Sequence, residues 1–524
     1  MPSDYQQRLS LLVESIDSKI LNQSRIGLEK ETLRVNREGG IATTPHPEVF
    51  GSALTNPYIT TDYSEALLEL ITPPFTQMRE ALAFLRDVQQ YVYSKPGDEI
   101  LWATSMPCVV AGETSIPIAQ YGSSNAGMMK TIYRHGLGYR YGRVMQVIAG
   151  VHYNFSFADE FWPQYQALQN DRQEPKAFIS ESYFAQLRNL QRLGWLVPYL
   201  FGASPAVCKS FLGGKPTTLS EFNENTYYEP YATSLRMGDI GYQNNKENET
   251  GIKANYDDLQ SYIQSLNKAI NTPCPEYTKI GVKVDGEYRQ LNANILQIEN
   301  EYYSTVRPKQ ITEANEKPIL ALQRRGVRYI ELRSLDVNAF DPMGINDTQL
   351  YFLEALMLYC LLQDSPLIDA AERVAIDQNE LLVAHRGREP GLQLVRRDGP
   401  ISLRDWGLEV CDEMQAVCEY LDSGVEDAPY SHALKKQRAA ILDPALTPSA
   451  RMLAEMRENG EGFYHFAKRK SLAHHAYFSQ LPIDPDRKAM LDKSVQESLA
   501  RQQALETEDD CSLDEYLERY YAQG

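Results

Sequence analysis

The stretch at residues 27–36, GLEKETLRVN, constrains the fold most strongly, because it has the pattern of a strand yet carries two carboxylates. In an extended chain successive side chains point to opposite faces, so Glu29 and Glu31 share a face with Leu33 and Val35. Buried carboxylates about 6–7 Å apart are costly unless a cation neutralises them, and Mg²⁺ or Mn²⁺ suits such oxygen ligands. An exposed edge strand with solvated charges explains the same pattern, and this stretch alone does not separate the two interpretations.

Composition places the chain among globular proteins and narrows its partners. Of 524 residues, 43% are hydrophobic and 23% are charged. The net charge is −18, from 52 basic and 70 acidic residues, which argues against nucleic acid or an anionic membrane as a partner. The N-terminus lacks the pattern of a signal peptide, and no apolar run is long enough to span a bilayer. We therefore expect a cytoplasmic protein that acts as a monomer on small molecules.

The seven cysteines are scattered along the chain, at positions 108, 208, 274, 360, 411, 418 and 511. They form no Cys-x-x-Cys pair and no spacing typical of a zinc site. We therefore expect free thiols in a reducing compartment and no disulfide framework.

Hydrophobic periodicity predicts an α+β protein. Helices are expected at 4–22, 77–94, 179–203, 257–270, 347–363, 403–422, 445–457 and 486–506, and strands at 27–36, 58–61, 67–72, 102–110, 150–156 and 326–335. The simplest arrangement is one core built from an antiparallel sheet that helices wrap and extend. We expect residues 1–340 to form the catalytic part and residues 341–524 to form a mostly helical region packed on the same core.

Further acids and a histidine fall on the expected inner face of other strands, namely Asp62, Glu69, His152 and Glu331. Each one alone has an ordinary explanation, such as a turn residue, an edge charge or a core histidine. Together with the first two glutamates they indicate a metal site, and a set dominated by carboxylates favours Mg²⁺ or Mn²⁺ over zinc.

A nucleotide would explain why several such cations gather, because they bridge phosphate oxygens during phosphoryl transfer. The sequence has no glycine-rich phosphate loop, so metals and arginines would have to hold the phosphates. Arg333, which shares a strand face with Glu331, is the natural candidate, and a structural ion pair is the alternative. Tyr133, Arg134, Arg236 and Tyr242 lie in polar stretches typical of substrate sites, although surface salt bridges explain the arginines equally well.

The chain resembles the glutamate-cysteine ligases of proteobacteria. The resemblance rests on six blocks in the order of the family: residues 27–36, 59–69, 150–156, 230–236, 296–301 and 329–335. It implies a glutamine-synthetase-like fold, in which a curved antiparallel sheet forms a funnel, surrounded and extended by helices, with metals on its inner wall. It also implies ATP-dependent ligation of the glutamate γ-carboxylate to the cysteine amine through γ-glutamyl phosphate, which is the first step of glutathione biosynthesis.

The resemblance implies a role for each candidate residue. The ligands of Mg²⁺ (or Mn²⁺) would be Glu29, Glu31, Asp62, Glu69, His152 and Glu331. Glu31, Arg333 and Arg134 would act on the reacting groups, with Arg333 facing the phosphates of ATP. Arg236, Gln146 and Asn154 would hold glutamate, whereas Tyr133, Arg134, Tyr242 and Tyr303 would shape the cysteine site. We also expect a loop from residues 217–255 to order over the site and exclude water.

Three alternatives remain open at this point. One is a carboxylate-amine ligase on the same scaffold that uses ATP but a different amine acceptor. A second is a non-catalytic metal-binding protein that keeps the scaffold, and a third is a metal-dependent hydrolase that uses the same carboxylates.

Overall fold

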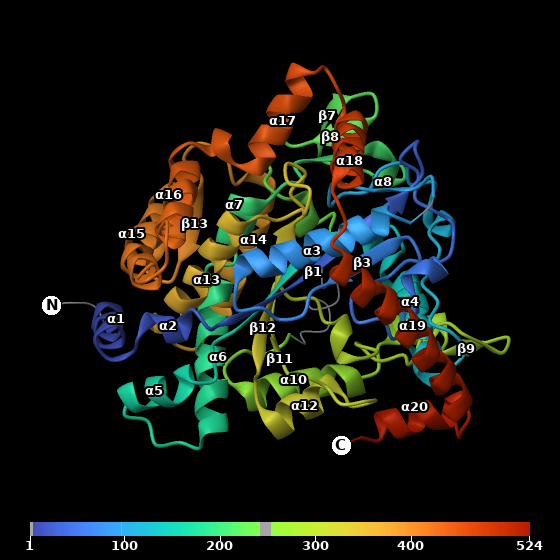
Figure 1. The fold of residues 1–524 in the computed structure, drawn as a ribbon, viewed down its shortest axis with the longest axis horizontal. Coiled ribbons are helices and arrows are strands. Elements are labelled where there is room, and N and C mark those ends of the chain that lie inside the picture. The colour runs from blue at the N-terminus through green and yellow to red at the C-terminus, as the bar shows by residue number, and fades with distance from the viewer. Residues whose placement is uncertain (1–3, 96, 242–252, 524) are drawn as a thin grey trace.

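A seven-stranded antiparallel sheet lies at the centre of the molecule in the computed structural model, which describes residues 4–95, 97–241 and 253–523 (Figure 1). The strands run in the order β11-β12-β5-β1-β3-β2, and the short β4 pairs with the end of β1. The sheet is open, with β11 and β2 at its edges. Its strands are β1 (Arg25–Val35), β2 (Ile59–Thr61), β3 (Leu67–Ile71), β4 (Ile100–Leu101), β5 (Gly150–Ser156), β11 (Val306–Lys309) and β12 (Tyr329–Asp336).

The interior position of β1 decides between the two interpretations of its glutamates. β1 pairs with β5 on one side and with β3 on the other, so it is not an edge strand. Its register sets Glu29 opposite His152 and Glu31 opposite Glu69. Both faces of β1 are covered, since Lys30 on the opposite face from Glu29 is also buried and donates to Gln89 of α3 (Met78–Tyr93).

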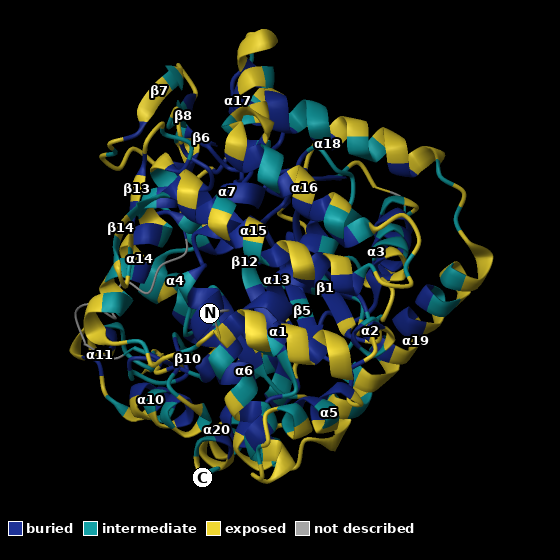
Figure 2. Ribbon diagram, turned by 90° about the vertical axis from the view of Figure 1, so that its left-hand side faces the viewer, coloured by how far each residue is buried: buried dark blue, intermediate teal, exposed yellow. Residues whose placement is uncertain are grey.

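Helices surround the sheet and supply most of the surface, so the prediction of an α+β fold is confirmed. Figure 2 shows β1, β5 and β12 in the buried interior and exposed residues on the outward faces of the surrounding helices. Besides α3, helices of eight or more residues are α1 (Asp4–Ser15), α4 (Asn125–Tyr141), α5 (Phe161–Leu168), α6 (Pro175–Arg192), α10 (Leu259–Asn271), α12 (Pro318–Arg325), α13 (Asp347–Leu362), α14 (Ala370–Arg386), α15 (Leu403–Leu421), α16 (Pro429–Leu442), α17 (Pro448–Glu458), α18 (Phe463–Gln480), α19 (Pro485–Glu508) and α20 (Leu513–Tyr521). The short helices are α2 (Ser18–Leu21), α7 (Leu196–Phe201), α8 (Lys209–Leu212) and α11 (Pro275–Ile280).

The predicted helices are found, but two of them are divided. The helix expected at 4–22 splits into α1 and α2, because Asp17 caps the start of α2. The helix expected at 179–203 corresponds to α6 and α7, which are separate helices. The buried α13 begins with a capping box between Asn346 and Gln349.

One strand prediction is wrong, and a hairpin lies in the region expected to be mostly helical. The segment 102–110, expected to be a strand, is irregular along its whole length, since β4 ends at Leu101. In the region expected to be helical, β13 (Gln393–Arg396) and β14 (Gly399–Ser402) form a hairpin. Elsewhere the short strands β6 (Ala206–Cys208), β7 (Ser220–Asn223) and β8 (Thr226–Tyr228) make a small sheet, and β9 (Lys283–Val284) pairs with β10 (Glu287–Tyr288).

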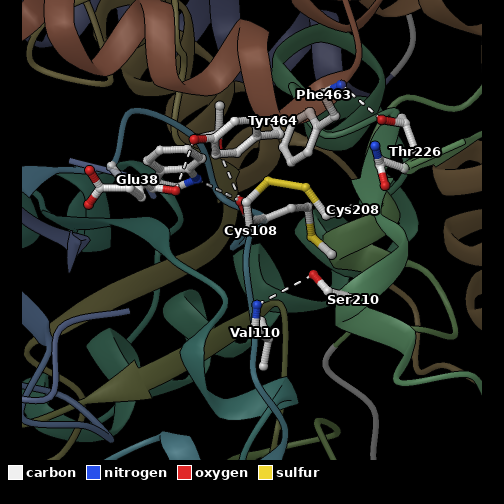
Figure 3. Close-up of a disulfide and its surroundings, with 12 residues drawn as sticks. Glu38, Cys108, Val110, Cys208, Ser210, Thr226, Phe463 and Tyr464 are labelled. Atoms are coloured by element: carbon white, nitrogen blue, oxygen red, sulfur yellow. Dashed lines mark hydrogen bonds between the residues drawn. A yellow bond between two sulfur atoms is a disulfide. The ribbon is translucent and has the colours of Figure 1, made fainter. Parts of the chain in front are cut away.

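The expectation that every cysteine is a free thiol is wrong. Cys108 and Cys208 form a disulfide, with their Cα atoms 5.5 Å apart and a separation of 100 positions in the sequence (Figure 3). Local spacing gave no sign of this pairing, because the loop after β4 meets β6 only in the folded chain. The other five cysteines are free, and four of them are buried.

No helix in the described part of the chain is both long enough and apolar enough to cross a membrane.

Candidate functional site

A cavity of about 520 Å³ opens on one face of the central sheet. Side chains from β1, β3, β5 and β12 form its floor, and its walls come from α4, the chain around residues 298–318 and α20. All six predicted metal ligands and five other predicted site residues line it: Glu29, Glu31, Asp62, Glu69, His152, Glu331, Tyr133, Arg134, Gln146, Tyr303 and Arg333.

The centre of the floor is a cluster of three carboxylates around one imidazole. His152 Nδ1 lies 3.0 Å from Glu29 Oε2 and 3.8 Å from Glu331 Oε1, while His152 Nε2 lies 3.6 Å from Glu31 Oε1. Ligand atoms of Glu29, His152 and Glu331 all lie within 4.8 Å of one another. The pairing of β1, β5 and β12 produces this cluster, because neighbouring strands present these residues on the same face of the sheet.

Two further carboxylates, one on β3 and one after β2, extend the cluster to the other side of β1. Glu69 lies opposite Glu31 in the β1–β3 pair, and Asp62 follows directly after β2. The backbone carbonyl of Asp62 accepts hydrogen bonds from Arg134 Nε and the Tyr121 hydroxyl, which fixes the position of this residue. The structure therefore brings all six predicted ligands to one cavity, and their binding of metal stays a prediction.

One side of the cluster is rich in cations. Arg333 Nη1 lies 3.2 Å and Lys309 Nζ 3.4 Å from Glu331 Oε1. Burial by itself would raise the pKa of Glu331, but Lys309, Arg333 and His152 hold it well below its usual range. Burial would also raise the pKa of Glu29, but the hydrogen bond with His152 and the positive charges of His152 and Lys309 together lower it.

On the other side of the cluster, around Glu31 and Glu69, nearby cations lower the carboxylate pKa values less than burial raises them. Burial raises the pKa of Glu31 in spite of His152. Burial also raises the pKa of Glu69 well above its usual value, and the negative charges of Glu29, Asp62 and Glu31 add to the shift. These carboxylates therefore need a positive partner to be ionised together.

Arg236 does not line the cavity, although it lies next to residues that do. It is 1% exposed, its Nη2 donates to the carbonyl of Arg333 at 2.9 Å, and its Nη1 lies 3.6 Å from Asp336 Oδ1. A Cβ atom at Gly150 would lie 2.1 Å from this guanidinium, so only glycine allows the close approach. The Gly150 amide also donates to Glu31 Oε2 at 2.6 Å, which links the arginine to the carboxylate cluster.

The other predicted glutamate-binding residues differ in position. Gln146 is buried and lines the cavity, in the short 3₁₀ turn before β5. Asn154 is not among the lining residues, and its Nδ2 donates to Glu29 Oε1 at 2.9 Å. In this structure Asn154 therefore orients a carboxylate of the cluster.

The predicted cysteine site lies on the inner face of α4. Tyr133 and Arg134 face the cavity from this helix, and Tyr303 lines it from the chain before β11. The Arg134 guanidinium packs on the ring of Tyr121, 4.5 Å from its centroid. Tyr242 lies outside the described residues, as does the 242–252 part of the loop expected to close over the site, so both predictions stay untested.

Several residues that line the cavity were not predicted from the sequence, and the most important are Arg307 and Lys309 on β11. They alternate along the strand in the same way as Glu29 and Glu31, which is a signal that could have been found. Pro308 between them argued against a strand, because proline is rare within central strands. β11 is an edge strand, where proline is tolerated. Tyr63 and the α20 residues Tyr516 and Tyr520 also line the cavity.

Comparisons with known proteins show the family of the chain. The sequence model of the family described as glutamate-cysteine ligase matches residues 9–383. A glutamate–cysteine ligase of Alcanivorax borkumensis is 47% identical over 521 residues, which cover 98% of this chain and 99% of the relative. One of Pseudomonas putida is 48% identical over 517 residues, which cover 98% of each chain.

Solved structures of related enzymes resemble this chain in fold. A crystal structure of glutamate–cysteine ligase from Francisella tularensis in complex with AMP has a TM-score of 0.89 and 38% identity, and the match covers 95% of this chain and 97% of that one. A bifunctional glutathione synthetase from Pasteurella multocida has a TM-score of 0.74 and 25% identity, over 94% of this chain and 58% of that chain. From the family match and these relatives, the chain belongs to the glutamate-cysteine ligase family.

Proposed function

We propose that this protein uses ATP to join the γ-carboxylate of L-glutamate to the amine of L-cysteine, the first step of glutathione biosynthesis. The observation that carries the proposal is the cluster of Glu29, His152 and Glu331 in a cavity of a chain 47% identical to a glutamate–cysteine ligase over 98% of its length. The AMP in the Francisella tularensis structure supports a nucleotide as one substrate.

The donor set fits Mg²⁺ or Mn²⁺, because five carboxylates accompany a single imidazole. Oε2 of Glu331 is buried and has no hydrogen-bond partner among the described residues, as expected for an atom that would contact a cation. The residues that would hold the ions are Glu29, Glu31, Asp62, Glu69, His152 and Glu331. When bound, the ions would neutralise these carboxylates and the phosphate oxygens of ATP.

The cations of the chain itself would complete the phosphate site. Arg333 and Lys309 both lie within 3.4 Å of the Glu331 carboxylate, and Arg307 is on the same strand as Lys309. Their fixed positive charges would stabilise the negative charge that develops during phosphoryl transfer. Arg134, on the opposite wall, would act on the same reacting groups.

The amino-acid substrates would occupy two sides of the cavity. Gln146 would hold glutamate from the cavity wall. Asn154, which orients Glu29, and Arg236, whose charge lies just behind Arg333, would support this site from outside the lining. Tyr133, Tyr303 and Tyr242 would shape the cysteine site. Tyrosine rings suit a small apolar side chain, and their hydroxyl groups can donate to its polar atoms.

The chemistry needs two displacement steps, because a free carboxylate has no good leaving group. An oxygen of the glutamate γ-carboxylate attacks the γ-phosphorus of ATP, and the bond to ADP breaks to give γ-glutamyl phosphate. The cysteine nitrogen then attacks the acyl carbon, loses a proton and expels inorganic phosphate. Arg333 and Glu31 would hold the charges of the first step in place.

We also propose the organisation of the protein. Residues 1–340 would form the catalytic part, and the mostly helical residues 341–524 would pack on the same core. Contacts of α18 and α19 with α3, and of α20 with α4, support the packing of the two parts on one core. The chain would work in the cytoplasm as a monomer on small molecules, without nucleic acid or membrane partners, in keeping with its net charge of −18.

One assay tests the function. ADP release is measured with glutamate alone, with cysteine alone, with both, and with other amines in place of cysteine. The ligation product is identified by mass spectrometry. We expect ADP and γ-glutamylcysteine in equal amounts when both amino acids are present. Efficient use of another amine would instead indicate a ligase with a different acceptor. Turnover without ATP would indicate a hydrolase, and a complete lack of ADP release would indicate a non-catalytic binding protein.

A further inference from the structure

The C-terminal helix α20 contributes directly to the cavity, although it lies far beyond residue 383, where the family match ends. Tyr516 and Tyr520 line the cavity from this helix. Tyr520 packs in one apolar cluster with Leu517 of α20 and with Met129 and Ile132 of α4. The two helices therefore share a core on the side of the cavity that carries Tyr133.

A chain of hydrogen bonds leads from α20 to Tyr133. The Tyr521 hydroxyl donates to the carbonyl of Gln297 at 2.8 Å and accepts from Asn292 Nδ2 at 2.9 Å. The fully buried Gln297 side chain then donates from Nε2 to the carbonyl of Tyr133 at 3.2 Å. Gln297 lies within block 296–301, for which the proposed chemistry gives no other role.

Gln297 is able to reach α4 because the helix has a notch at Gly136. A Cβ atom on Gly136 would lie 2.1 Å from Gln297 Oε1, so any larger residue would push Gln297 away from the helix. The segment before α20 holds the other end of α4, because the Asn125 amide donates to Asp509 Oδ2 at 2.6 Å and Asn125 Nδ2 donates to the Cys511 carbonyl at 2.9 Å.

α20 is itself held firmly at its C-terminal end. The buried Lys317 donates from Nζ to the carbonyls of Tyr521 at 3.0 Å and Gln523 at 2.9 Å, where a cation also complements the helix dipole. The Tyr516 hydroxyl donates to Asn315 Oδ1 at 2.8 Å. A helix fixed in this way can act as a rigid support for its neighbours.

We propose that α20 forms the outer wall of the cysteine site, with Tyr516 and Tyr520 as wall residues and Tyr521 as a positioning residue that acts on Tyr133 through Gln297. This inference rests on the proposed ligase function. It assigns to the C-terminal segment a part in recognising the amine acceptor.

The test compares Tyr521→Phe with wild type in the full-length enzyme. The substitution keeps the ring and removes the hydroxyl together with its hydrogen bonds to Gln297 and Asn292. We expect the KM for cysteine to rise about threefold to tenfold, because the support of Tyr133 through Gln297 is weakened. The KM values for glutamate and ATP should stay within about twofold of wild type. Tyr477→Phe, on the exposed surface of α18, is the matched control and should change none of the three constants.

A second pair of variants probes the wall. Tyr516→Ala should raise the KM for cysteine more than Tyr516→Phe, because only the alanine variant removes the ring. An unchanged KM for cysteine in both Tyr521→Phe and Tyr516→Ala would overturn the inference. The inference would also be overturned if only the KM for ATP rose, or if the KM rose equally for all substrates. A lower melting temperature as the only effect would overturn it as well.

The two proposals fail in different ways. If wild-type enzyme releases ADP without any need for cysteine, the ligase function itself is wrong. If wild type requires cysteine but the α20 variants keep its normal KM, only the role of α20 is wrong.

Discussion

Glu31 and Glu69 lie directly opposite each other in the β1–β3 pair, so two carboxylates meet at a position where neighbouring strands normally avoid like charges. Burial raises the pKa of both groups. The arrangement is unfavourable in the protein alone and becomes favourable when a divalent cation neutralises it.

This relationship predicts that Mg²⁺ raises the melting temperature of wild type, measured by thermal denaturation in EDTA and at increasing Mg²⁺ concentrations. In Glu69→Gln one charge of the pair is gone, so the variant should be more stable than wild type in EDTA, by about 0.2–1 kcal/mol. It should also gain less from Mg²⁺. A Mg²⁺ response equal to that of wild type would contradict the assignment of Glu69 as a ligand.

Glu31→Gln tests the catalytic role of the second glutamate. We expect turnover at saturating Mg²⁺ to fall at least ~10²-fold, because electrostatic stabilisation of the transition state is lost, while the circular dichroism spectrum stays unchanged. Glu38→Gln, in the exposed turn after β1, is the control and should have wild-type turnover. Near-normal turnover of Glu31→Gln would show that this carboxylate has no catalytic role.

His385 should make part of the stability depend on pH. Its Nδ1 lies 2.9 Å from Glu229 and its Nε2 3.0 Å from Asp239, at the two ends of the segment that carries Arg236. Burial lowers the pKa of His385, but the two carboxylates outweigh burial and raise it above its ordinary value. The protonated bridge is therefore complete below the ordinary histidine pKa of about 6.5 and is lost as the pH rises through the raised value.

The measurement is the free energy of unfolding of wild type and His385→Gln between about pH 6 and pH 9. Wild type should be more stable by about 1 kcal/mol at the acid end, and the difference should shrink towards the alkaline end. The exposed His432→Gln serves as the control. A difference between wild type and His385→Gln that stays constant with pH would rule out the charged bridge.

The Cys108–Cys208 disulfide should stabilise the protein without taking part in catalysis. It closes a loop of 100 residues, and neither cysteine lines the cavity. In the absence of reductant, Cys108→Ala should lower the free energy of unfolding by about 2–4 kcal/mol through the larger entropy of the unfolded chain. Urea denaturation checks the stability, and ADP release at low temperature checks the activity. A loss of turnover in the folded variant would connect the disulfide to the site.

Alternation of side chains was enough to predict the floor of the site. The patterns around Glu29, His152 and Glu331 place these residues on the inner faces of their strands, and the structure has them there. Pairing and register could not be predicted from the patterns, because they depend on which distant strands meet. The contact of Glu29 with His152, 123 residues away in the sequence, is a property of the folded sheet.

Other parts of the site left only a weak local signal or none. Lys309 stands on an edge strand that Pro308 disguises, and Tyr521 acts through Gln297, with which it shares no sequence pattern. Cys108 meets Cys208 in the same way, through the approach of two distant segments. Long-range contacts of this kind follow from packing, which a pattern of residue types does not specify.

The most direct measurement of the proposed chemistry follows an oxygen atom. Glutamate labelled with ¹⁸O in its γ-carboxylate is incubated with ATP, Mg²⁺, cysteine and the enzyme, and the inorganic phosphate is analysed by ³¹P NMR. If γ-glutamyl phosphate forms, one ¹⁸O atom from glutamate appears in each phosphate released. Phosphate free of label, released together with γ-glutamylcysteine, would contradict the acyl phosphate and with it the roles proposed for Arg333 and Glu31.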